Sequence, residues 1–562
     1  MSTRQSYRWI FSEQAHSEEF EQLRDSLKFD NILTSILWSR GVKDFEAARR
    51  FFRPSPDFMH DPFQMADMKK AAERVVQAIA EKERIMVYGD YDVDGTTAVA
   101  LVSSYLDEYT ENVVTYIPDR YKEGYGLSED GIRFASDNEI SLIIALDCGI
   151  KAHNQAKLAV ELGIDLIIGD HHNPGTTLPE AFAVLDPKRT DCAYPYKELS
   201  GCGVGYKLCV AVEQLQGRDG SALYQHLDLL AISIAADIVP ITGENRVLAH
   251  LGMDVLNMQN RPAIRLMVQE AKKTKFNITD VVFTIAPRIN AAGRIKHASA
   301  AVELMKSKDG LEAQGVLAEI NRHNAERKKL DSSITELALN QVEELAQFEN
   351  STVVYHESWH KGVIGIVASR LIETYYRPTV VFTKSNGVLA GSARSVTGFN
   401  LYDALEHCSE HLIQFGGHMY AAGMTMKEEK LEDFRTAFDA YIAKNLSEEQ
   451  KTPELKIDAE LDLETVDNQF LRRLKMFEPH GPGNPLPTFS MRPKKVEGIR
   501  VIGSSGDHLK FKVLGIDCIA FKMAEWEKDL QKGNVEMAFH IEENEFRGRI
   551  STQLRVLDIR RV

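Results

Sequence analysis

Carboxylates and imidazoles stand at the ends of four apolar runs in this sequence. They are Asp90, Asp92 and Asp94 after the first run, Asp147 after the second, Asp170, His171 and His172 after the third, and Asp237 after the fourth. One aspartate after a strand is usually a turn or helix-capping residue. Carboxylates brought together from four such sites would repel one another and bind protons. A cation resolves that conflict, so we expect a metal centre.

The ligand types narrow the choice of metal. Carboxylate oxygens with one or two imidazoles and no thiolate suit Mn²⁺ or Mg²⁺ better than structural zinc. The two-residue spacing of Asp92 and Asp94 lets one loop present carboxylates to two different ions, while a third acid bridges them. Two such ions, about 3.5–4 Å apart, activate water and stabilise the leaving oxygen of a phosphodiester. The predicted cofactors are therefore two divalent cations, Mn²⁺ or Mg²⁺.

Strands of a parallel α/β sheet are expected to position these residues. From about residue 70, short apolar runs alternate with amphipathic helical stretches. The clearest strands are predicted at 85–88, 113–117, 142–146, 166–168 and 181–185, and the run 231–236 delivers Asp237 in the same way. The carboxyl ends of parallel strands line the ligand crevice of an open sheet. We therefore expect the acids and histidines to meet at that edge.

The second half of the sequence has a different organisation. A helical pattern over 308–348 indicates a long helix that connects two domains, and two helices broken near Asn324 are the alternative. Strands at 352–355 and 379–382, with a helix at 363–372, predict a smaller α/β unit. Short strands at 494–502, 509–514, 518–521, 535–541 and 554–559 predict a small β-barrel, for which the oligonucleotide-binding fold is the obvious candidate.

Composition bounds the class of protein. The net charge of −15 counts against nucleic-acid binding, although it says nothing about a local groove. No apolar run approaches the roughly 20 residues that span a bilayer, and the first residues lack a signal-peptide core. We therefore expect a cytoplasmic protein that is not a membrane protein. Six scattered cysteines indicate reduced thiols rather than disulfides.

The ordered motifs resemble those of the DHH phosphoesterase superfamily. The matching stretches are DYDVDGTTA (90–98), LDCG (146–149), GDHH (169–172) and AADIVP (235–240), and PRINAAGR (287–294) is typical of the RecJ branch. WHKGVIGIVASRL (359–371), GSARS (391–395) and FGGHMYAAG (415–423) resemble the associated DHHA1 domain, and GPGNPLPTF (481–489) and NEFRGR (544–549) extend the resemblance. The predicted domains are a helical extension (1–65), a DHH domain (66–307), a connecting helix (308–348), a DHHA1 domain (349–450) and an OB fold (451–562).

The resemblance implies a role for each motif residue. Asp147 is expected to bridge the two ions, Asp92 to bind one of them, and Asp94, His171 and Asp237 to bind the other, with Asp90 as an additional ligand. His172 is expected to contact phosphate, and Asp170 to orient a histidine. The residues expected to bind phosphate or DNA are Arg288, Asn290 and Arg294, then Ser392, Arg394 and Arg120 for the terminal 5′ phosphate, and Gly417 and His418 in a glycine loop. A basic and aromatic face of the barrel is expected at Lys494, Lys495, Lys510, Lys512, Phe546 and Arg547.

The resemblance also implies the activity. We expect a 5′→3′ exonuclease specific for single-stranded DNA, active in DNA repair and recombination, which releases 5′-mononucleotides by a two-metal mechanism. Duplex would be excluded by a narrow passage, and the enzyme is expected to act as a monomer recruited by single-strand-binding protein or a helicase. Two alternatives stay open at this point: a phosphodiesterase acting on short oligonucleotides or cyclic dinucleotides, and a non-catalytic scaffold.

Overall fold

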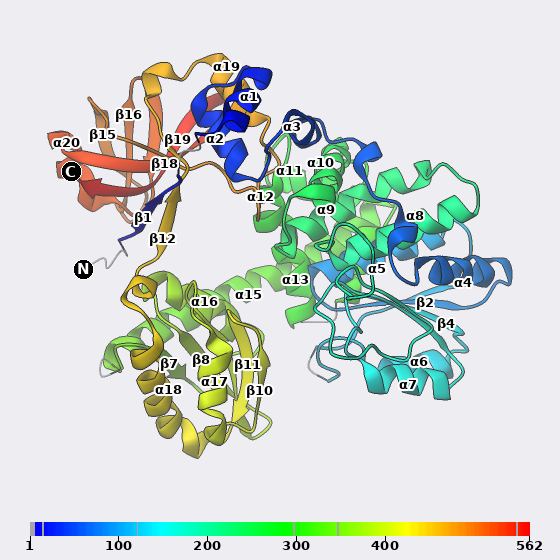
Figure 1. Ribbon diagram of the computed structural model, residues 1–562. Helices are drawn as coiled ribbons and strands as arrows, with labels where there is room; N and C mark the ends of the chain where they lie inside the picture. The colour runs from blue at the N-terminus through cyan, green and yellow to red at the C-terminus, as the bar shows by residue number, and fades with distance from the viewer. Residues whose placement is uncertain (1–5, 14–15, 121, 296–297, 346–347, 547–548) are drawn as a thin grey trace. The chain divides into compact units, whose positions relative to one another are not determined.

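The computed structural model describes residues 6–13, 16–120, 122–295, 298–345, 348–546 and 549–562. The chain divides into two compact units. Unit 1 holds residues Met1–Lys43, Glu326–Leu474 and Leu486–Val562, and unit 2 holds Asp44–Ala325 and Lys475–Pro485. Figure 1 shows the elements of both, and each unit is described by itself below.

Unit 2 is built on a five-stranded parallel sheet with the order β3-β2-β4-β5-β6. The strands are β2 (Ile85–Gly89), β3 (Val113–Tyr116), β4 (Leu142–Leu146), β5 (Asp165–Gly169) and β6 (Ala183–Leu185). Each begins and ends within two residues of its predicted position. The prediction of a parallel α/β sheet is therefore confirmed.

Helices cover both faces of this sheet. Along β2, Ile85 and Val87 belong to one buried core, whereas Met86 and Tyr88 belong to the other, as alternation along a strand requires. The helices of unit 2 are α3 (Phe45–Phe52), α4 (Met68–Ala80), α5 (Val93–Leu106), α6 (Glu129–Asp137), α7 (His153–Glu161), α8 (Gly201–Leu215), α9 (Leu227–Ala236), α10 (Gly243–Met258), α11 (Pro262–Glu270), α12 (Ile278–Asp280), α13 (Ala286–Ile295) and α14 (Ser299–Lys306). A π-helix, Val281–Ile285, leads into α13.

One continuous helix, α15 (Gly310–Glu344), runs across the boundary of the two units. The alternative of two helices broken near Asn324 is therefore wrong. At its second half, Ile334, Ala338 and Val342 pack into a core of unit 1. There Arg370 donates to the buried carboxylate of Asp331, from Nε at 2.8 Å and from Nη2 at 2.9 Å.

The first sheet of unit 1 has the order β10-β11-β9-β8-β7, with a parallel β7–β8 pair and antiparallel pairs elsewhere. Its strands are β7 (Thr352–Tyr355), β8 (Thr379–Ser385), β9 (Val388–Arg394), β10 (Gln414–Gly417) and β11 (Ala421–Met426). The helices α16 (Ile364–Thr374), α17 (Leu401–His407) and α18 (Leu431–Asn445) accompany it. This is the smaller α/β unit that the sequence predicts.

The second sheet of unit 1 has seven strands in the order β13-β14-β18-β19-β17-β16-β15. They are β13 (Ala459–Glu460), β14 (Phe489–Met491), β15 (Glu497–Ile502), β16 (His508–Val513), β17 (Ile516–Ala520), β18 (Val535–Phe546) and β19 (Arg549–Arg561), with the helices α19 (Asn468–Lys475) and α20 (Glu527–Lys532). All five C-terminal strands predicted from the sequence are present, and β18 and β19 are longer than predicted.

The N-terminal region contains a strand that the helical prediction missed. Before α1 (Glu18–Leu27) and α2 (Asn31–Ser39), the strand β1 (Arg8–Phe11) pairs in parallel with β12 (Glu454–Ile457). The buried indole of Trp9 donates to Asp558 Oδ2 at 2.9 Å. Residues 8–11 therefore pack with the C-terminal part of unit 1, although nothing local in the sequence marks them as a strand.

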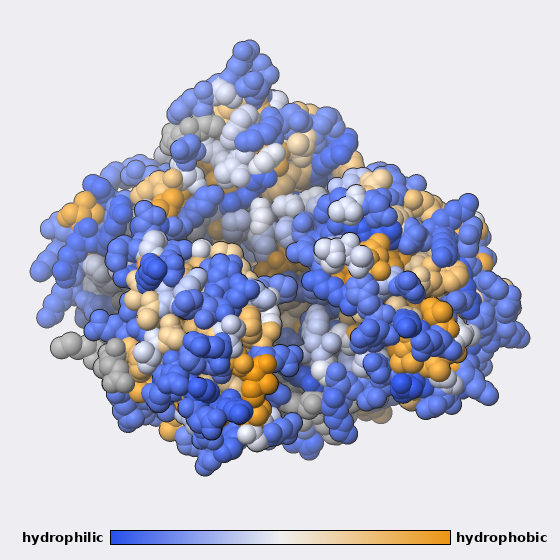
Figure 2. Space-filling view, turned by 60° about the horizontal axis from the view of Figure 1, so that its bottom comes forward, coloured by the Kyte–Doolittle hydropathy of each residue, from blue (hydrophilic) through white to orange (hydrophobic). Residues whose placement is uncertain are grey.

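The surface and the cysteines agree with the composition. Figure 2 shows hydrophilic side chains over most of one face, with apolar residues in small separate areas. All six cysteines are free and buried, as expected of reduced thiols. The described helices include none with the length and apolarity that a bilayer crossing requires.

Candidate metal centre and phosphate-binding residues

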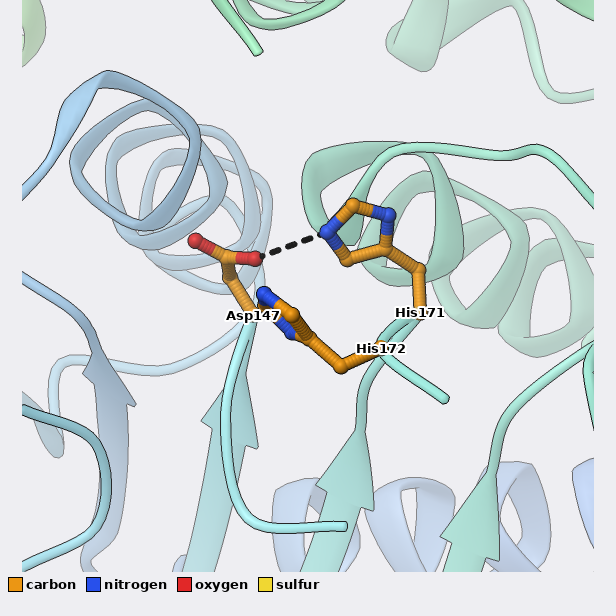
Figure 3. Close-up of side chains that lie close together, drawn as sticks. All are labelled: Asp147, His171 and His172. Atoms are coloured by element: carbon orange, nitrogen blue, oxygen red, sulfur yellow. Dashed lines mark ion pairs between the residues drawn. The ribbon is translucent and has the colours of Figure 1, made fainter. Parts of the chain in front are cut away.

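The carboxyl ends of three neighbouring strands deliver the acids and histidines to one edge of the sheet. Asp90 directly follows β2, Asp147 follows β4, and Asp170, His171 and His172 follow β5. Figure 3 shows both imidazoles beside the carboxylate of Asp147, each on the loop that leaves its strand. The predicted convergence at the strand ends is therefore seen in the structure.

Asp237 reaches the same place from a helix, which corrects the expected strand at 231–236. That run is the end of α9, and Asp237 is the residue that caps it. Every residue from Leu227 to Ala235 in α9 is buried, and a short buried helix has the same continuous apolar pattern as a buried strand. The Asp237 side chain still points into the centre, with Oδ2 3.5 Å from His171 Nε2.

His171 lies at the middle of the cluster. Its Nε2 atom is 3.2 Å from Asp147 Oδ1, 3.5 Å from Asp237 Oδ2 and 3.8 Å from Asp94 Oδ2. Two sets of three residues each offer ligand atoms that all lie within 4.8 Å of one another. The first set is Asp94, His171 and Asp237, and the second is Asp147, His171 and His172. The two overlapping sets place the candidate ligands of a cation side by side around His171.

Several buried polar atoms in the cluster have no hydrogen-bond partner within the described ranges. They are both carboxylate oxygens of Asp147, both ring nitrogens of His171 and Oδ2 of Asp90. Buried polar groups in proteins are nearly always hydrogen-bonded, and orphaned acceptors that face one another call for an ion. Asp147 is also held at a φ of +58°, which carboxylate residues tolerate better than most. These residues fit a divalent cation.

The electrostatics agree with that fit. Burial, and then repulsion from Asp94 and Asp92, raises the pKa of Asp147 well above its usual range. Burial and repulsion from Asp94 raise the pKa of Asp237 to about 8, and burial together with Asp92 does the same to the pKa of Asp90. Without a cation these carboxylates bind protons at neutral pH; a bound cation favours their charged form.

Asp94 is fixed by donors that the sequence did not single out. Its carboxylate accepts from the backbone N–H of Gly201 at 2.7 Å, from that of Cys202 at 2.8 Å, and from Ser233 Oγ at 2.7 Å. The first two lie at the N-terminus of α8, where the helix dipole stabilises a negative charge. A Cβ on Gly201 would lie 2.5 Å from the Cβ of Asp147, so only glycine lets this helix approach. The signal was the glycine-rich start SGCGVG at 200–205.

Asp170 orients His172 rather than facing the open centre. Its carboxylate accepts from the N–H of Ile150 at 2.9 Å, from that of His171 at 2.7 Å, and from His172 Nδ1 at 2.8 Å. Burial alone would raise the pKa of Asp170, but the hydrogen bond and charge of His172 outweigh it and lower the pKa to about 2. Burial alone would lower the pKa of His172, but Asp170 raises it to about 9. His172 is therefore a protonated imidazole at neutral pH.

A loop of aromatic and basic residues flanks the centre. Tyr125, 56% exposed, has its hydroxyl 3.3 Å from His172 Nε2 and its ring in edge contact with Tyr91. Arg120 lies over the ring of Tyr91, with Cζ 4.9 Å from its centroid. Glu123 holds the loop by accepting from Tyr116 Oη at 3.0 Å. The sequence prediction named Arg120 but missed Tyr125, whose signal is its place in the same motif, IPDRYKEGYGL.

Asp186 is a further acid that the sequence prediction missed. It directly follows β6, so the rule that picked out Asp90 and Asp147 applies to it equally. It is fully buried and accepts from the N–H of Lys188 at 2.7 Å, while its Oδ2 has no partner within the described residues. Burial raises its pKa to about 7.

Of the three phosphate-binding residues predicted in PRINAAGR, the structure shows side-chain hydrogen bonds among the described residues for Arg288 only. Arg288 donates from Nε to Asn321 Oδ1 at 2.8 Å and forms an ion pair with Glu270 at 3.1 Å. Asn290 is half-buried on α13. The side chain of Arg294 lies outside the described residues. Phosphate binding by these residues stays a prediction, and Arg288 must exchange its present partners to take part.

In unit 1, Ser392 and Arg394 lie together against the first turn of α16. Arg394 Nη1 donates to Ser392 Oγ at 3.2 Å. A Cβ on Gly365 would lie 2.9 Å from Ser392 Oγ and 3.2 Å from Arg394 Nη2, so glycine leaves the space open. A helix N-terminus beside a hydroxyl and a guanidinium is a suitable site for a phosphate. Gly365 was not singled out, although it stands in the quoted stretch WHKGVIGIVASRL.

The structure shows the predicted glycine loop, and it pairs the lysines of the predicted DNA-binding face with acids. Gly417 has a φ of +149° and a Cβ there would collide with the carbonyl of Ala421, so the turn requires glycine, and His418 beside it is exposed. The lysines expected to bind DNA face acids: Lys494 pairs with Glu464, Lys495 with Glu497, and Lys510 and Lys512 with Asp517. The side chain of Phe546 and all of Arg547 lie outside the described residues.

Three family models match the chain. The DHH family N-terminal domain matches residues 84–234, the DHHA1 domain matches 349–444, and the RecJ OB domain matches 457–558.

Similar proteins cover nearly the whole chain. The single-stranded-DNA-specific exonuclease RecJ of Bacillus subtilis strain 168 is 38% identical over 550 residues, which are 96% of this chain and 69% of that protein. The protein of the same name from Escherichia coli K12 is 32% identical, over 93% of this chain and 94% of that protein. The crystal structure of RecJ from Thermus thermophilus in complex with Mn²⁺ aligns with a TM-score of 0.85 at 27% identity, over 99% of this chain and 80% of that one. The Mg²⁺ complex of that protein aligns with a TM-score of 0.79.

Proposed function

Because the chain belongs to the RecJ family of single-stranded-DNA-specific exonucleases, we propose that the residues gathered around His171 are its catalytic metal centre. The protein is a metal-dependent exodeoxyribonuclease that hydrolyses phosphodiester bonds of single-stranded DNA, and its cofactor is Mn²⁺ or Mg²⁺. The observation that supports the location is the set of buried polar atoms on Asp147 and His171 that have no hydrogen-bond partner among the described residues.

The proposed ligands take the first set of atoms whole, take Asp147 from the second, and add Asp90 and Asp92 from the acidic loop. Asp94, His171 and Asp237 would hold one cation, and Asp147 would bridge it to a second, which Asp92 and Asp90 serve. When bound, the cations lower the pKa of water toward neutrality and neutralise charge on the phosphate. The three donors to Asp94 fix the position of its carboxylate.

His172 would act on the phosphate rather than on the metal. Asp170 occupies its Nδ1, so Nε2 is the nitrogen left to face a substrate. Asp170 raises the pKa of the ring to about 9 in the metal-free protein, so near neutral pH Nε2 carries a proton there that His172 can donate to a non-bridging phosphate oxygen. Tyr125 lies beside that nitrogen and is placed to share the same oxygen or to pack against the nucleotide.

The 5′ end would be read in unit 1. Ser392 and Arg394, with the first turn of α16 at Gly365, support a site for the terminal 5′ phosphate, and Arg120, beside Tyr91 in unit 2, is separately proposed to bind phosphate. The phosphate roles of Arg288, Asn290, Arg294, Gly417 and His418 and the domain limits 1–65, 66–307, 308–348, 349–450 and 451–562 are also proposals, supported by the order of the motifs. The family models that match within these limits agree in order.

The decisive experiment follows a long single-stranded DNA labelled at its 5′ or its 3′ end, in Mn²⁺. We expect early release of 5′-labelled mononucleotide, no release from blunt duplex, and loss of activity in Asp147→Ala. Asp186→Asn serves as a matched control, because this equally buried acid is outside the proposed ligand set. Cleavage of dinucleotides with no action on long strands would support the small-substrate phosphodiesterase instead.

Three finer predictions concern the setting of the enzyme. We propose that it works as a monomer in the cytoplasm and is brought to DNA by single-strand-binding protein or a helicase, since its net charge of −15 favours recruitment over unassisted binding. Light scattering of the purified protein measures the first. Degradation rates on naked and on protein-coated single strands measure the last, and equal rates would contradict recruitment.

A further inference from the structure

One motif of the sequence has no part in the function so far. The stretch GPGNPLPTF begins inside Lys475–Pro485, a segment that belongs to unit 2 although the chain on both sides of it belongs to unit 1. We call Lys475–Pro485 the return segment. Because the residues before and after it belong to unit 1, the return segment must be held in unit 2 by its own contacts there.

A buried arginine of α10 holds the return segment by its backbone. Arg246 is 3% exposed and donates to the carbonyls of four consecutive residues: Met476 at 3.3 Å, Phe477 at 3.1 Å, Glu478 at 2.9 Å and Pro479 at 3.3 Å. Its Nε donates to the backbone carbonyl of Phe51 at 2.8 Å, and its Cζ lies 3.7 Å from the centroid of the Phe51 ring. The fixed fork of an arginine suits such a set of acceptors, which the single ammonium of lysine cannot match.

The return segment is also braced internally. Asn484, 1% exposed, donates from Nδ2 to the carbonyls of Phe477 at 2.8 Å and Pro479 at 2.9 Å. Gly481 and Asn484 exchange backbone hydrogen bonds of 2.9 Å in both directions. The ring of Phe477 packs edge-on against Phe51 and Phe52. The segment is therefore a rigid turn rather than a loose connection.

The tip of this turn presses on the loop that follows Asp237. The N–H of Ile241 donates to the carbonyl of Pro482 at 2.7 Å. A Cβ on Gly481 would lie 2.5 Å from Ile241 Cδ1, and one on Gly483 would lie 2.7 Å from Thr242 Cγ2. Glycine at both positions lets the backbone of the return segment reach the loop directly.

The loop from Asp237 to Thr242 needs outside support. Ile238 has a φ of +60°, a conformation that costs a β-branched residue about 1–2 kcal/mol, and its side chain is 72% exposed and offers no packing in return. The carbonyl of Pro240 accepts from Tyr196 Oη at 3.1 Å and from Asn245 Nδ2 at 3.0 Å. Together with the bond from Ile241 to the return segment, these contacts hold the strained turn beside Asp237.

We infer that the return segment is a positioning element for the metal ligand Asp237, and that Arg246 is the positioning residue that keeps it in place. The inference rests on the proposed role of Asp237 in the metal centre. It gives the GPGNP sequence a function in unit 2: residues 481–483 pack against the loop after Asp237 and so orient a metal ligand. Loss of these contacts should weaken metal binding without removing any ligand.

The test measures Mn²⁺ affinity of the full-length protein by calorimetry. In Gly481→Ala the new methyl must displace Ile241, and we expect affinity to fall about tenfold, the usual effect of losing a partner that orients a ligand. In an Ile241→Ala background the nearest remaining atom of residue 241, its Cβ, is 3.8 Å away, so the same glycine substitution should have little further effect. Val268→Ala, a buried change on α11, is the control for lost stability alone and should leave affinity unchanged.

The outcomes separate this inference from the proposed function. Wild-type affinity in Gly481→Ala, or an equal loss in both backgrounds, would overturn the positioning role. Wild-type affinity in Asp237→Ala would instead refute the ligand assignment on which it rests. If Gly481→Ala does not fold, Arg246→Lys keeps the buried charge but not the fork, and a severalfold loss of affinity supports the inference whereas unchanged affinity overturns it.

Discussion

Replacing Asp237 by asparagine should make the metal-free protein more stable. Asparagine keeps the shape of the side chain but carries no charge. In the folded protein burial and the neighbouring carboxylate of Asp94 raise the pKa of Asp237 from 3.8 to about 8. A raised pKa means that stability is fully present below the unfolded-state pKa and is lost progressively as pH rises toward the folded-state value.

The size of the effect follows from that interval. Each pKa unit is about 1.4 kcal/mol, so the carboxylate costs about 2 kcal/mol at pH 5 and about 4 kcal/mol at pH 7. These are upper bounds, because protonation of one acid relieves its neighbours. Excess Mn²⁺ acts in the opposite direction: at a hundred times the Kd it stabilises the wild-type protein by about 2.7 kcal/mol and the variant by less, so the advantage of the variant shrinks.

Urea unfolding in EDTA at pH 5 and pH 7, and then in Mn²⁺, measures both parts. We expect the free energy of unfolding of Asp237→Asn to exceed that of the wild type in EDTA, more at pH 7 than at pH 5, and the difference to become smaller in Mn²⁺. A variant no more stable than the wild type in EDTA at pH 7, or an advantage that does not shrink at pH 5, would refute the account of a buried, self-repelling cluster.

Three further predictions address the same centre and its supports. Mn²⁺ binding at pH 7 should release about one to two protons, because Asp90 and Asp237 both have a pKa of about 8 in the metal-free protein; calorimetric heats that do not change with the ionisation enthalpy of the buffer would contradict this. Ile238→Gly should raise the free energy of unfolding by about 1 kcal/mol, since glycine adopts a positive φ without strain and the exposed side chain buries nothing; a lower urea midpoint would count against the strain. Asp331→Asn should lower the free energy of unfolding by about 1–3 kcal/mol by weakening the acceptor of Arg370, and because the pair lies in unit 1, Mn²⁺ affinity should stay at the wild-type value.

Local sequence pattern was sufficient for the strands and for the convergence of most of the acids and histidines on one edge of the sheet. The strands that carry Asp90, Asp147 and His171 are short apolar runs with an acid at the end, and a parallel sheet brings such ends together whatever the intervening sequence. Asp237 was found by the same reasoning for a partly wrong reason. Its apolar run is a buried helix, yet its carboxylate still reaches His171.

The features that the sequence could not predict depend on contacts between residues far apart along the chain. Asp94 is held by Gly201 and Ser233, more than 100 residues along the chain, and only the position of a helix N-terminus in space reveals them. The return segment has the composition of an ordinary Gly/Pro turn, because its partner Arg246 lies 230 residues or more away. The pairing of β1 with β12 has no local signal either, since four residues with one buried side chain show no clear alternation.

The pairing of β1 with β12 also has a consequence for how the protein is made. Arg8 and its partner Glu454 are separated by 446 residues, so the first strand leaves the ribosome long before its partner exists. At about 5–20 residues per second, the wait is roughly 20–90 s. During that time Trp9 has no Asp558 to accept its hydrogen bond, and the strand presents an unpaired edge. Unit 2 can begin to fold while synthesis continues, but the return segment is the last part of it to be synthesised. The nascent chain therefore lacks the contacts of the return segment with the loop after Asp237 until residues 475–485 have been synthesised.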